Sequence, residues 1–309
     1  MHTSVLLKEC LEYLGLQENS VIVDCTLGRA GHSSEILKKI PKGHLYAFDQ
    51  DEEAILASRE RLSAIGDNFT IIKSNFAFLK EQLQQQGITQ VDGILFDLGV
   101  SSPQLDEEER GFSFHKEARL DMRMDQSQIL SAYEVVNTYS YEDLTRILYQ
   151  YGEEKYAASI VKKIIQKREE KPIETTLELV QIIQSAVPAK YKREKHPARK
   201  TFQAIRMEVN RELEVLEIAL KDALTILRPN GRICVITFHS LEDKLVKTIF
   251  RSVTEVPNEV KKLPVLPEAY QREYQLVKVV VPKEPEVQEN KRARSAKLRV
   301  IERIKEGSQ

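Results

Sequence analysis

The chain has no tryptophan and only three cysteines among its 309 residues. Cys10, Cys25 and Cys234 are scattered and form no C-x-x-C pair, which argues against a zinc site and fits a reducing cytoplasm. No apolar run approaches the ~20 residues that a membrane helix needs, and the short N-terminal one is interrupted by charges, so we expect no signal peptide. These absences predict a cytoplasmic protein without a metal.

An excess of positive charge is also lacking, because the formal net charge is −1. The charge is nevertheless uneven. Lys190 to Arg211 holds eight Lys or Arg against two acidic residues, and Lys291 to Lys305 holds seven against one. Local basic clusters on a neutral protein favour a polyanion bound at one face. The alternative for each cluster is a solvated helix or tail.

Short apolar runs alternate with helical patterns over the first hundred residues and again near the end. This alternation predicts an α/β fold with a parallel sheet covered on both faces. A turn is expected at Arg228 to Arg232, directly before the fifth strand. The last two apolar runs alternate with polar residues, as in antiparallel strands at the end of that sheet. Residues 256–267 and 282–291 resemble linkers. The predicted strands are Val21–Asp24, His44–Asp49, Phe69–Ile72, Gly93–Asp97, Ile233–Phe238, Tyr274–Val281 and Lys297–Ile304.

Between the fourth and fifth predicted strands the pattern becomes helical. Apolar residues recur at i, i+3, i+4 and i+7, and Ser140 with Asp143 resembles a helix cap. We therefore expect one domain from residues 1–104 and 212–309 and an inserted helical domain from residues 105–211. The insertion follows the end of a strand, where open α/β sheets place their ligands.

The segment after the first predicted strand holds the strongest functional signal. Asp24 is followed by a turn with Gly28, Ala30 and Gly31 and then by a helical pattern. Strand, glycine loop and helix is the layout of a nucleotide-type cofactor site, where glycines allow close approach of the backbone to a ligand. The order D-x-x-x-G-x-x-G favours an S-adenosylmethionine (SAM) site over a dinucleotide site. A tight turn without a ligand is the alternative.

Side chains at the ends of the next strands complete a candidate site. Asp49 ends the second strand, where an acidic residue accepts hydrogen bonds from ribose hydroxyls. Asp51 is a rival, but it stands at the start of a helix, where an acid is a usual dipole partner. Phe76 follows the third strand and is a candidate to face adenine, with a core role as the alternative.

Asp97 ends the fourth strand, where amino-methyltransferases carry a catalytic tetrapeptide. The acid matches that tetrapeptide, whereas its double proline and aromatic residue are missing here. An aromatic amine is a poor nucleophile, so acceptors such as Asp97, Ser101 and Ser102 would orient it for in-line transfer. This makes Asp97 the best catalytic candidate.

Three further residues are candidates for substrate contacts. His239 ends the fifth strand and either reaches the same crevice or caps the following helix. Phe112 and Phe114 lie in a polar loop and either stack on an extruded base or fill a seam between the domains. In the basic segment, Arg199, Lys200 and Arg206 are candidates for phosphate contacts.

The chain resembles the bacterial methyltransferases that modify N4 of a decoding-site cytosine in 16S ribosomal RNA. The match runs in order from end to end. It rests on the segments His2–Leu7, Thr26–Ser33, Phe96–Leu105, Arg110–Phe114, Leu120–Met124, His196–Arg206, Ser240–Asp243 and Arg292–Ser295.

The resemblance implies a Rossmann-like SAM-dependent domain, an inserted RNA-binding domain, and 16S rRNA within the small ribosomal subunit as partner. It also implies cofactor contacts, in which Asp97 would compete with its own catalytic role. Ala30 replaces a glycine common in the family, which should be tolerated unless the position needs positive φ. The implied cofactor residues are Ala30, Gly31, His32, Asp49, Phe76, Asp97 and Gln104.

Other functions stay open on the sequence alone. An NAD-dependent dehydrogenase is disfavoured by the missing third glycine and by the insertion. A ribosome-assembly factor that kept a SAM pocket, or a methyltransferase for another nucleic-acid amine, would share the same motifs. Whether two copies of the chain associate as a homodimer is also left open.

Overall fold

The computed structural model describes residues 4–99, 108–194, 196–256 and 272–304. Contacts divide the chain into two compact units. Unit 1 comprises Met1–Gly99 and Leu213–Gln309, and unit 2 comprises Val100–Glu212. No helix in the described ranges is both long and apolar enough to cross a membrane.

Unit 1 is built on a seven-stranded sheet with the strand order β3-β2-β1-β4-β5-β7-β6. The first five strands run parallel and β7 is antiparallel to both of its neighbours, so the predicted α/β, Rossmann-like sheet with an antiparallel end is confirmed. The strands are β1 (Val21–Asp24), β2 (His44–Asp49), β3 (Phe69–Lys73), β4 (Val91–Asp97), β5 (Leu227–Thr237), β6 (Tyr274–Val280) and β7 (Lys297–Arg303).

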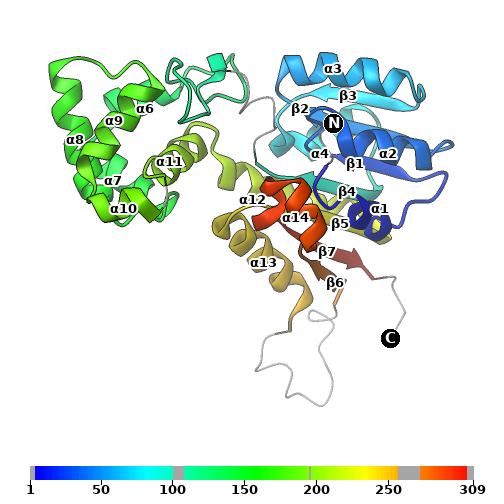
Figure 1. The fold of residues 1–309 in the computed structure, drawn as a ribbon. Coiled ribbons are helices and arrows are strands. Elements are labelled where there is room, and N and C mark those ends of the chain that lie inside the picture. Colours follow the sequence, from blue (N-terminus) through cyan, green and yellow to red (C-terminus); the bar gives the residue numbers. More distant parts are fainter. Residues whose placement is uncertain (1–3, 100–107, 195, 257–271, 305–309) are drawn as a thin grey trace. The chain divides into compact units, whose positions relative to one another are not determined.

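Helices cover both faces of this sheet (Figure 1). Alternate strand residues point to opposite faces, so Val23 and Phe96 pack on one side while Ile22 and Leu95 pack on the other. The first side carries α4 (Leu79–Gln85), α12 (Glu212–Ile226) and α13 (Ser240–Thr254). The second carries α1 (Leu7–Tyr13), α2 (Gly31–Lys39), α3 (Glu52–Ser63) and the 3-10 helix η5 (Lys291–Ser295).

Two predicted connections of unit 1 are wrong. The turn expected at Arg228 to Arg232 lies inside β5, where the pairing with β4 shifts and Asn230 has φ +65. The expected linker at 282–291 contains α14 (Glu284–Glu289), and Glu286 Oε1 accepts from the backbone N–H of Leu6, at 2.7 Å. Most of the other expected linker, 256–267, lies outside the described residues.

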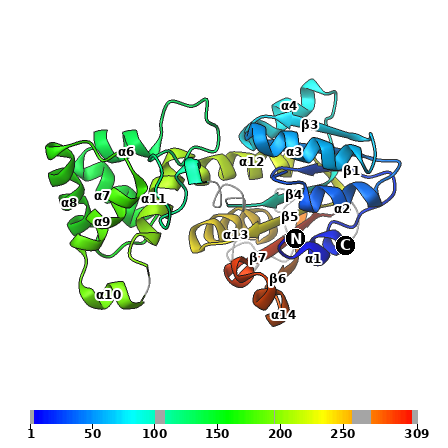
Figure 2. The same cartoon turned by 45° about the horizontal axis from the view of Figure 1, so that its top comes forward.

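Unit 2 is helical, with a hydrophobic core of its own (Figure 2). Capping boxes begin α6 at Ser131 and α9 at Thr175, and Ser140 caps α7 as predicted. The isolated bridge between Arg119 and Thr175 ties the preceding loop to α9. The helices are α6 (Ala132–Thr138), α7 (Tyr141–Gln150), α8 (Ala157–Glu170), α9 (Thr176–Ala186), α10 (Ala189–Glu194) and α11 (Arg199–Val209), preceded by the 3-10 helix η2 (Glu108–Arg110).

Candidate active site

The loop between β1 and α2 lies at the carboxyl ends of the central strands. Strands β1 and β4 are neighbours at the point where the strand order reverses, which is where open α/β sheets bind ligands. The N–H of Leu27 donates to Phe48 O at 2.9 Å, and Ser58 Oγ donates to Gly28 O at 2.6 Å. The glycine loop is therefore held by β2 and α3.

Ala30 adopts a left-handed backbone conformation, with φ +56 and ψ +35, and it immediately precedes α2. Gly28 is also left-handed, at φ +51. Alanine was expected to be tolerated at position 30 unless the position needs positive φ, and the position does need it. A side chain in this region costs roughly 1–2 kcal/mol.

Gly31 is in close contact with the side chain of Ser4, and its backbone angles are not in the left-handed region. A Cβ at this position would lie 1.9 Å from Ser4 Oγ. The N-terminal segment that carries Ser4 therefore packs directly on the first turn of α2. This contact explains in physical terms why a motif at the N-terminus accompanies the glycine loop.

Two carboxylates and one imidazole lie together behind this loop; Asp24 and His32 are buried and Asp97 is half-buried. Asp24 accepts from Ser33 Oγ at 2.6 Å and from the N–H of Thr26 at 3.0 Å. His32, only 5% exposed, places Nδ1 3.4 Å from Asp97 Oδ2 and Nε2 3.1 Å from Val5 O. Burial raises the pKa of Asp24.

Asp97 is placed at the end of β4 by its own backbone, whose N–H donates to Thr26 Oγ1 at 2.7 Å. Its side chain is 26% exposed overall, yet Oδ1 is buried and has no hydrogen-bond partner among the described residues. A buried carboxylate oxygen without a partner is costly unless a ligand supplies a donor. Ser101, Ser102 and Gln104 lie outside the described residues.

Asp49 ends β2 with both carboxylate oxygens held by backbone donors. Gly28 N–H donates to Oδ2 and Asp51 N–H donates to Oδ1, each at 2.9 Å. Burial raises the pKa of Asp49 to about 6, although these hydrogen bonds oppose the shift. Asp51 accepts from Glu53 N–H and is the N-cap of α3, as its place at a helix start suggested.

Phe76 begins the short helix η1 (Phe76–Phe78) after β3 and is half-buried. Its ring meets that of Phe96 edge to face, with the centroids 5.7 Å apart. Both roles weighed from the sequence, core packing and a face for adenine, are compatible with this position.

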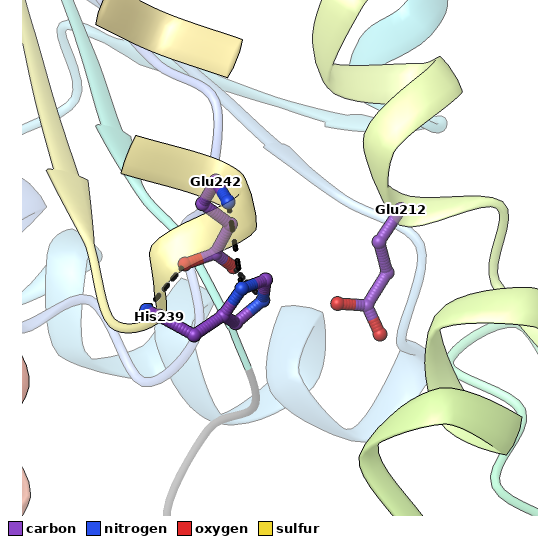
Figure 3. A group of neighbouring side chains, drawn as sticks. All are labelled: Glu212, His239 and Glu242. Carbon is purple, nitrogen blue, oxygen red and sulfur yellow. Dashed lines mark hydrogen bonds and ion pairs between the residues drawn. The ribbon is translucent and has the colours of Figure 1, made fainter. Parts of the chain in front are cut away.

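His239 is the N-cap of α13 and forms a capping box with Glu242 (Figure 3). Glu242 N–H donates to His239 Nδ1 at 3.4 Å, while Glu242 Oε2 accepts from the N–H groups of Phe238 and His239. His239 Nε2 is buried, lying 3.1 Å from Glu242 Oε1 without a hydrogen bond. The capping alternative therefore describes its contacts in the structure.

The two phenylalanines of the polar loop pack within unit 2. Phe112 is buried in its core, and Phe114 is half-buried. The Phe114 ring stacks on His196 at a centroid distance of 4.4 Å, and the exposed His115 ring lies 5.1 Å from that of His196. Sequence reasoning missed this histidine pair, because its members stand eighty residues apart.

The three basic candidates of the Lys190 to Arg211 segment differ in their surroundings. Arg199 is exposed at the start of α11. Lys200 Nζ donates to Glu153 O at 2.6 Å, and Arg206 forms a two-point ion pair with Glu212 at 2.7 and 2.8 Å. Arg206 is thus committed to a partner inside unit 2.

In the second basic cluster, Lys291 to Lys305, the three cations of β7 have structural partners, whereas Lys291, Arg292 and Arg294 of η5 are exposed. Lys297 and Arg299 of β7 both pair with Asp243 of α13, at 2.7 Å each. Arg303 donates to Leu227 O at 2.7 Å. The alternative of a solvated tail therefore does not describe the cations of β7, which is an interior strand of the sheet, as predicted for Lys297–Ile304.

The residues around the glycine loop fit SAM. The cofactor carries a sulfonium and an ammonium, and the carboxylates of Asp24, Asp49 and Asp97 all stand at strand ends beside this loop. The unpartnered Asp97 Oδ1 offers a further acceptor.

Comparison with known proteins decides the family. The model of the MraW methylase family matches residues 1–304. The ribosomal RNA small subunit methyltransferase H of Exiguobacterium sibiricum is 53% identical over 308 residues, which cover 99% of either chain. The chain belongs to the MraW methylase family. It is therefore a methyltransferase, and S-adenosylmethionine is its methyl donor.

Solved structures also resemble the chain. An rRNA methylase from Streptococcus thermophilus matches with a TM-score of 0.45 and 12% identity, covering 99% of this chain and all of that one. A Streptococcus mutans structure that contains SAH matches at 0.45 and 14%, covering 98% and 100%. These likenesses add nothing to the family assignment.

Proposed function

We propose that this methyltransferase modifies the N4 amine of a decoding-site cytosine in 16S rRNA of the small ribosomal subunit. The high identity to a ribosomal RNA small subunit methyltransferase supports an rRNA substrate. The observation that supports the choice of an amine is Asp97 Oδ1, a buried acceptor beside the glycine loop that has no partner in the part of the chain that the structure describes. An amine donor would satisfy it.

The cofactor, when bound, supplies an electrophilic methyl group on its sulfonium. With the cofactor bound, the N4 lone pair would form the new N–C bond while the C–S bond breaks with its electrons left on sulfur, and one N–H proton would leave the product nitrogen. Asp97 orients the amine through Oδ1 and is a base that can accept that proton. In-line positioning supplies most of the remaining acceleration.

In this proposal the cofactor lies along the glycine loop. Asp49 accepts from the ribose hydroxyls and Phe76 faces the adenine ring. Gly31 and His32 contribute main-chain N–H groups at the start of α2, where such donors gather, and Ala30, whose own N–H donates to Leu27 O, completes the turn beside the cofactor. Asp97 and Gln104 contact the methionine end.

Unit 2 is proposed as the RNA-binding domain. Arg199 and Lys200 begin α11, three residues after the His196 ring that stacks on Phe114. Cations next to half-buried aromatic rings suit phosphates and unpaired bases. Because Phe112 is buried, base stacking is proposed for the Phe114 and His196 side of this cluster, with Phe112 supporting it. Arg206 and His239 act as supports of the local structure.

The test is methyl transfer to small subunits from cells that lack this protein, read as N4-methylcytidine by mass spectrometry. Asp97→Asn should lower turnover roughly 100-fold and weaken SAM binding far less. Asp67→Asn, an exposed acid before β3, is the matched control. Equal losses of turnover and affinity would assign Asp97 to the cofactor alone. Binding of SAM and subunits without methyl transfer by the unmodified protein would favour an assembly factor instead.

A further inference from the structure

His32 is surrounded on both ring nitrogens by oxygen acceptors. Val5 O lies 3.1 Å from Nε2, and the carboxylate of Asp97 lies 3.4 Å from Nδ1. A neutral imidazole carries one N–H and one lone pair, so either tautomer would point a lone pair at an oxygen. Only the imidazolium, with two N–H groups, donates to both.

We propose that His32 is a positioning residue whose imidazolium holds the Asp97 carboxylate through Oδ2 and leaves Oδ1 available for the ligand. The ring is in turn fixed by the Val5 carbonyl, on the N-terminal segment that packs on Gly31. Since both ring nitrogens are taken within the protein, the side chain has none left for the cofactor. Any contact of His32 with SAM is therefore made by its backbone.

The electrostatic surroundings favour the charged ring. Burial lowers the pKa of His32, but the hydrogen bond to Asp97 and the negative charges of Asp97 and Asp24 outweigh it, so the pKa is raised. On the neighbouring α1, burial raises the pKa of Cys10 well above its ordinary value, which leaves a neutral thiol. The imidazolium thus faces the carboxyl groups of Asp97 and Asp24.

The proposed pairing of His32 with Asp97 depends on the proposed function in one respect, which is the identity of the amine that binds to Asp97 Oδ1. The pairing itself is a property of the protein without substrate. It is therefore tested first by nitrogen NMR of the His32 ring in the ligand-free protein, with His44 as the internal reference. His44 is half-buried at the start of β2, with Nε2 on Thr70 Oγ1.

Two outcomes of the NMR titration are distinguishable. We expect both His32 nitrogens to be protonated at a pH where His44 is already neutral, and Asp97→Asn to lower the His32 midpoint by roughly one pH unit or more. A neutral His32 ring at the same pH as His44, or a midpoint that Asp97→Asn leaves unchanged, would overturn the pairing. Either result is independent of whether rRNA is the substrate.

A double-mutant cycle tests whether His32 acts through Asp97. His32→Leu should lower turnover about 100-fold in the native background and have little further effect in Asp97→Ala. His32→Asn, which keeps an N–H near the Nδ1 position, should lose less. His44→Asn is the control variant and should keep full activity. Independent, multiplicative losses from His32→Leu and Asp97→Ala would overturn the positioning role even with both variants folded.

Discussion

The backbone conformation of Ala30 affects stability in a way that the residue type alone does not show. Ala30 holds a left-handed conformation, which glycine adopts without the steric cost of a Cβ. Ala30→Gly should therefore raise the free energy of unfolding by about 0.5–1 kcal/mol, because relief of strain exceeds the added chain entropy.

Urea denaturation measures this difference, and Ala57→Gly supplies the contrast. Ala57 lies inside α3, where the same substitution should lower stability by about 1 kcal/mol. A loss of stability in Ala30→Gly of the same size as in Ala57→Gly would contradict the strain assigned to position 30.

The carboxyl group of Asp49 makes cofactor affinity dependent on pH. Its pKa is raised to about 6, first by burial. In the proposed site the ribose hydroxyls donate to the ionised carboxylate. Affinity for SAH should fall roughly tenfold between pH 7.5 and 5, measured by calorimetry. Because this pKa lies above the value in the unfolded chain, ionisation of Asp49 costs stability at neutral pH, and that cost fades as pH falls. The loss of SAH affinity at low pH is therefore not caused by a loss of stability from protonation of Asp49.

The substitution Asp49→Asn should reduce affinity at pH 7.5 at least tenfold and flatten the pH profile. If SAH affinity in this variant still falls as steeply with pH, the group that titrates is Asp24 or His32 rather than Asp49.

Among the elements, α13 and β7 are joined by one acid and two bases. Asp243 accepts from both Lys297 and Arg299. Burial raises the pKa of Asp243, but these hydrogen bonds outweigh it and hold the pKa below its ordinary value. The stabilisation is therefore present above the unfolded pKa and is lost as pH falls through the folded one.

At pH 7, Asp243→Asn should lower the free energy of unfolding by about 1–2 kcal/mol, and the difference should shrink below pH 4. Glu217→Gln, which breaks an exposed pair with Lys221, should change it by less than about 0.5 kcal/mol. Equal effects of the two variants would mean that the Asp243 cluster is no stronger than a surface pair.

The strands were predictable because each is a short apolar run bounded by turn residues. His44–Asp49 is reproduced with both ends, and β6 and β7 differ from their predicted ranges by one residue each. The predicted turn inside β5 misled because Pro and Gly are also used in strand irregularities. Helix α14 was missed because six residues with few apolar positions carry no periodicity, and its anchor, Glu286 on Leu6, is distant in sequence.

Only those site residues that end a strand could be predicted from the sequence. Asp49 and Asp97 follow apolar runs, so their place at one edge of a parallel sheet follows from topology. The His32 contacts with Val5 and Asp97 depend on three segments that only folding brings together. No local pattern marks a histidine whose two nitrogens both meet oxygens.

For the molecule as a whole, the net charge is close to zero, so binding of RNA depends on which basic cluster contacts the phosphates. In the second basic cluster Lys297 and Arg299 are engaged by Asp243. The start of α11, where Arg199 is exposed near the stacked Phe114 and His196 rings, is therefore the candidate to test first. Replacing Arg199 and Lys200 together by alanine should weaken binding to the small subunit. The slope of log affinity against log salt should fall by about 1.4–1.8, corresponding to two phosphate contacts. SAM affinity should stay unchanged, since neither residue belongs to unit 1.

Binding measured across a salt series tests this prediction against a control of equal charge. Lys162→Ala combined with Lys163→Ala removes two cations from α8 of the same unit. If the α11 pair contacts phosphates, its slope falls while that of the α8 variant stays near the native value. Equal slopes in both variants would mean that total charge rather than position governs association. Unchanged binding and methylation in the α11 variant would make this cluster a solvated helix face, because lost phosphate contacts cannot leave the salt dependence intact.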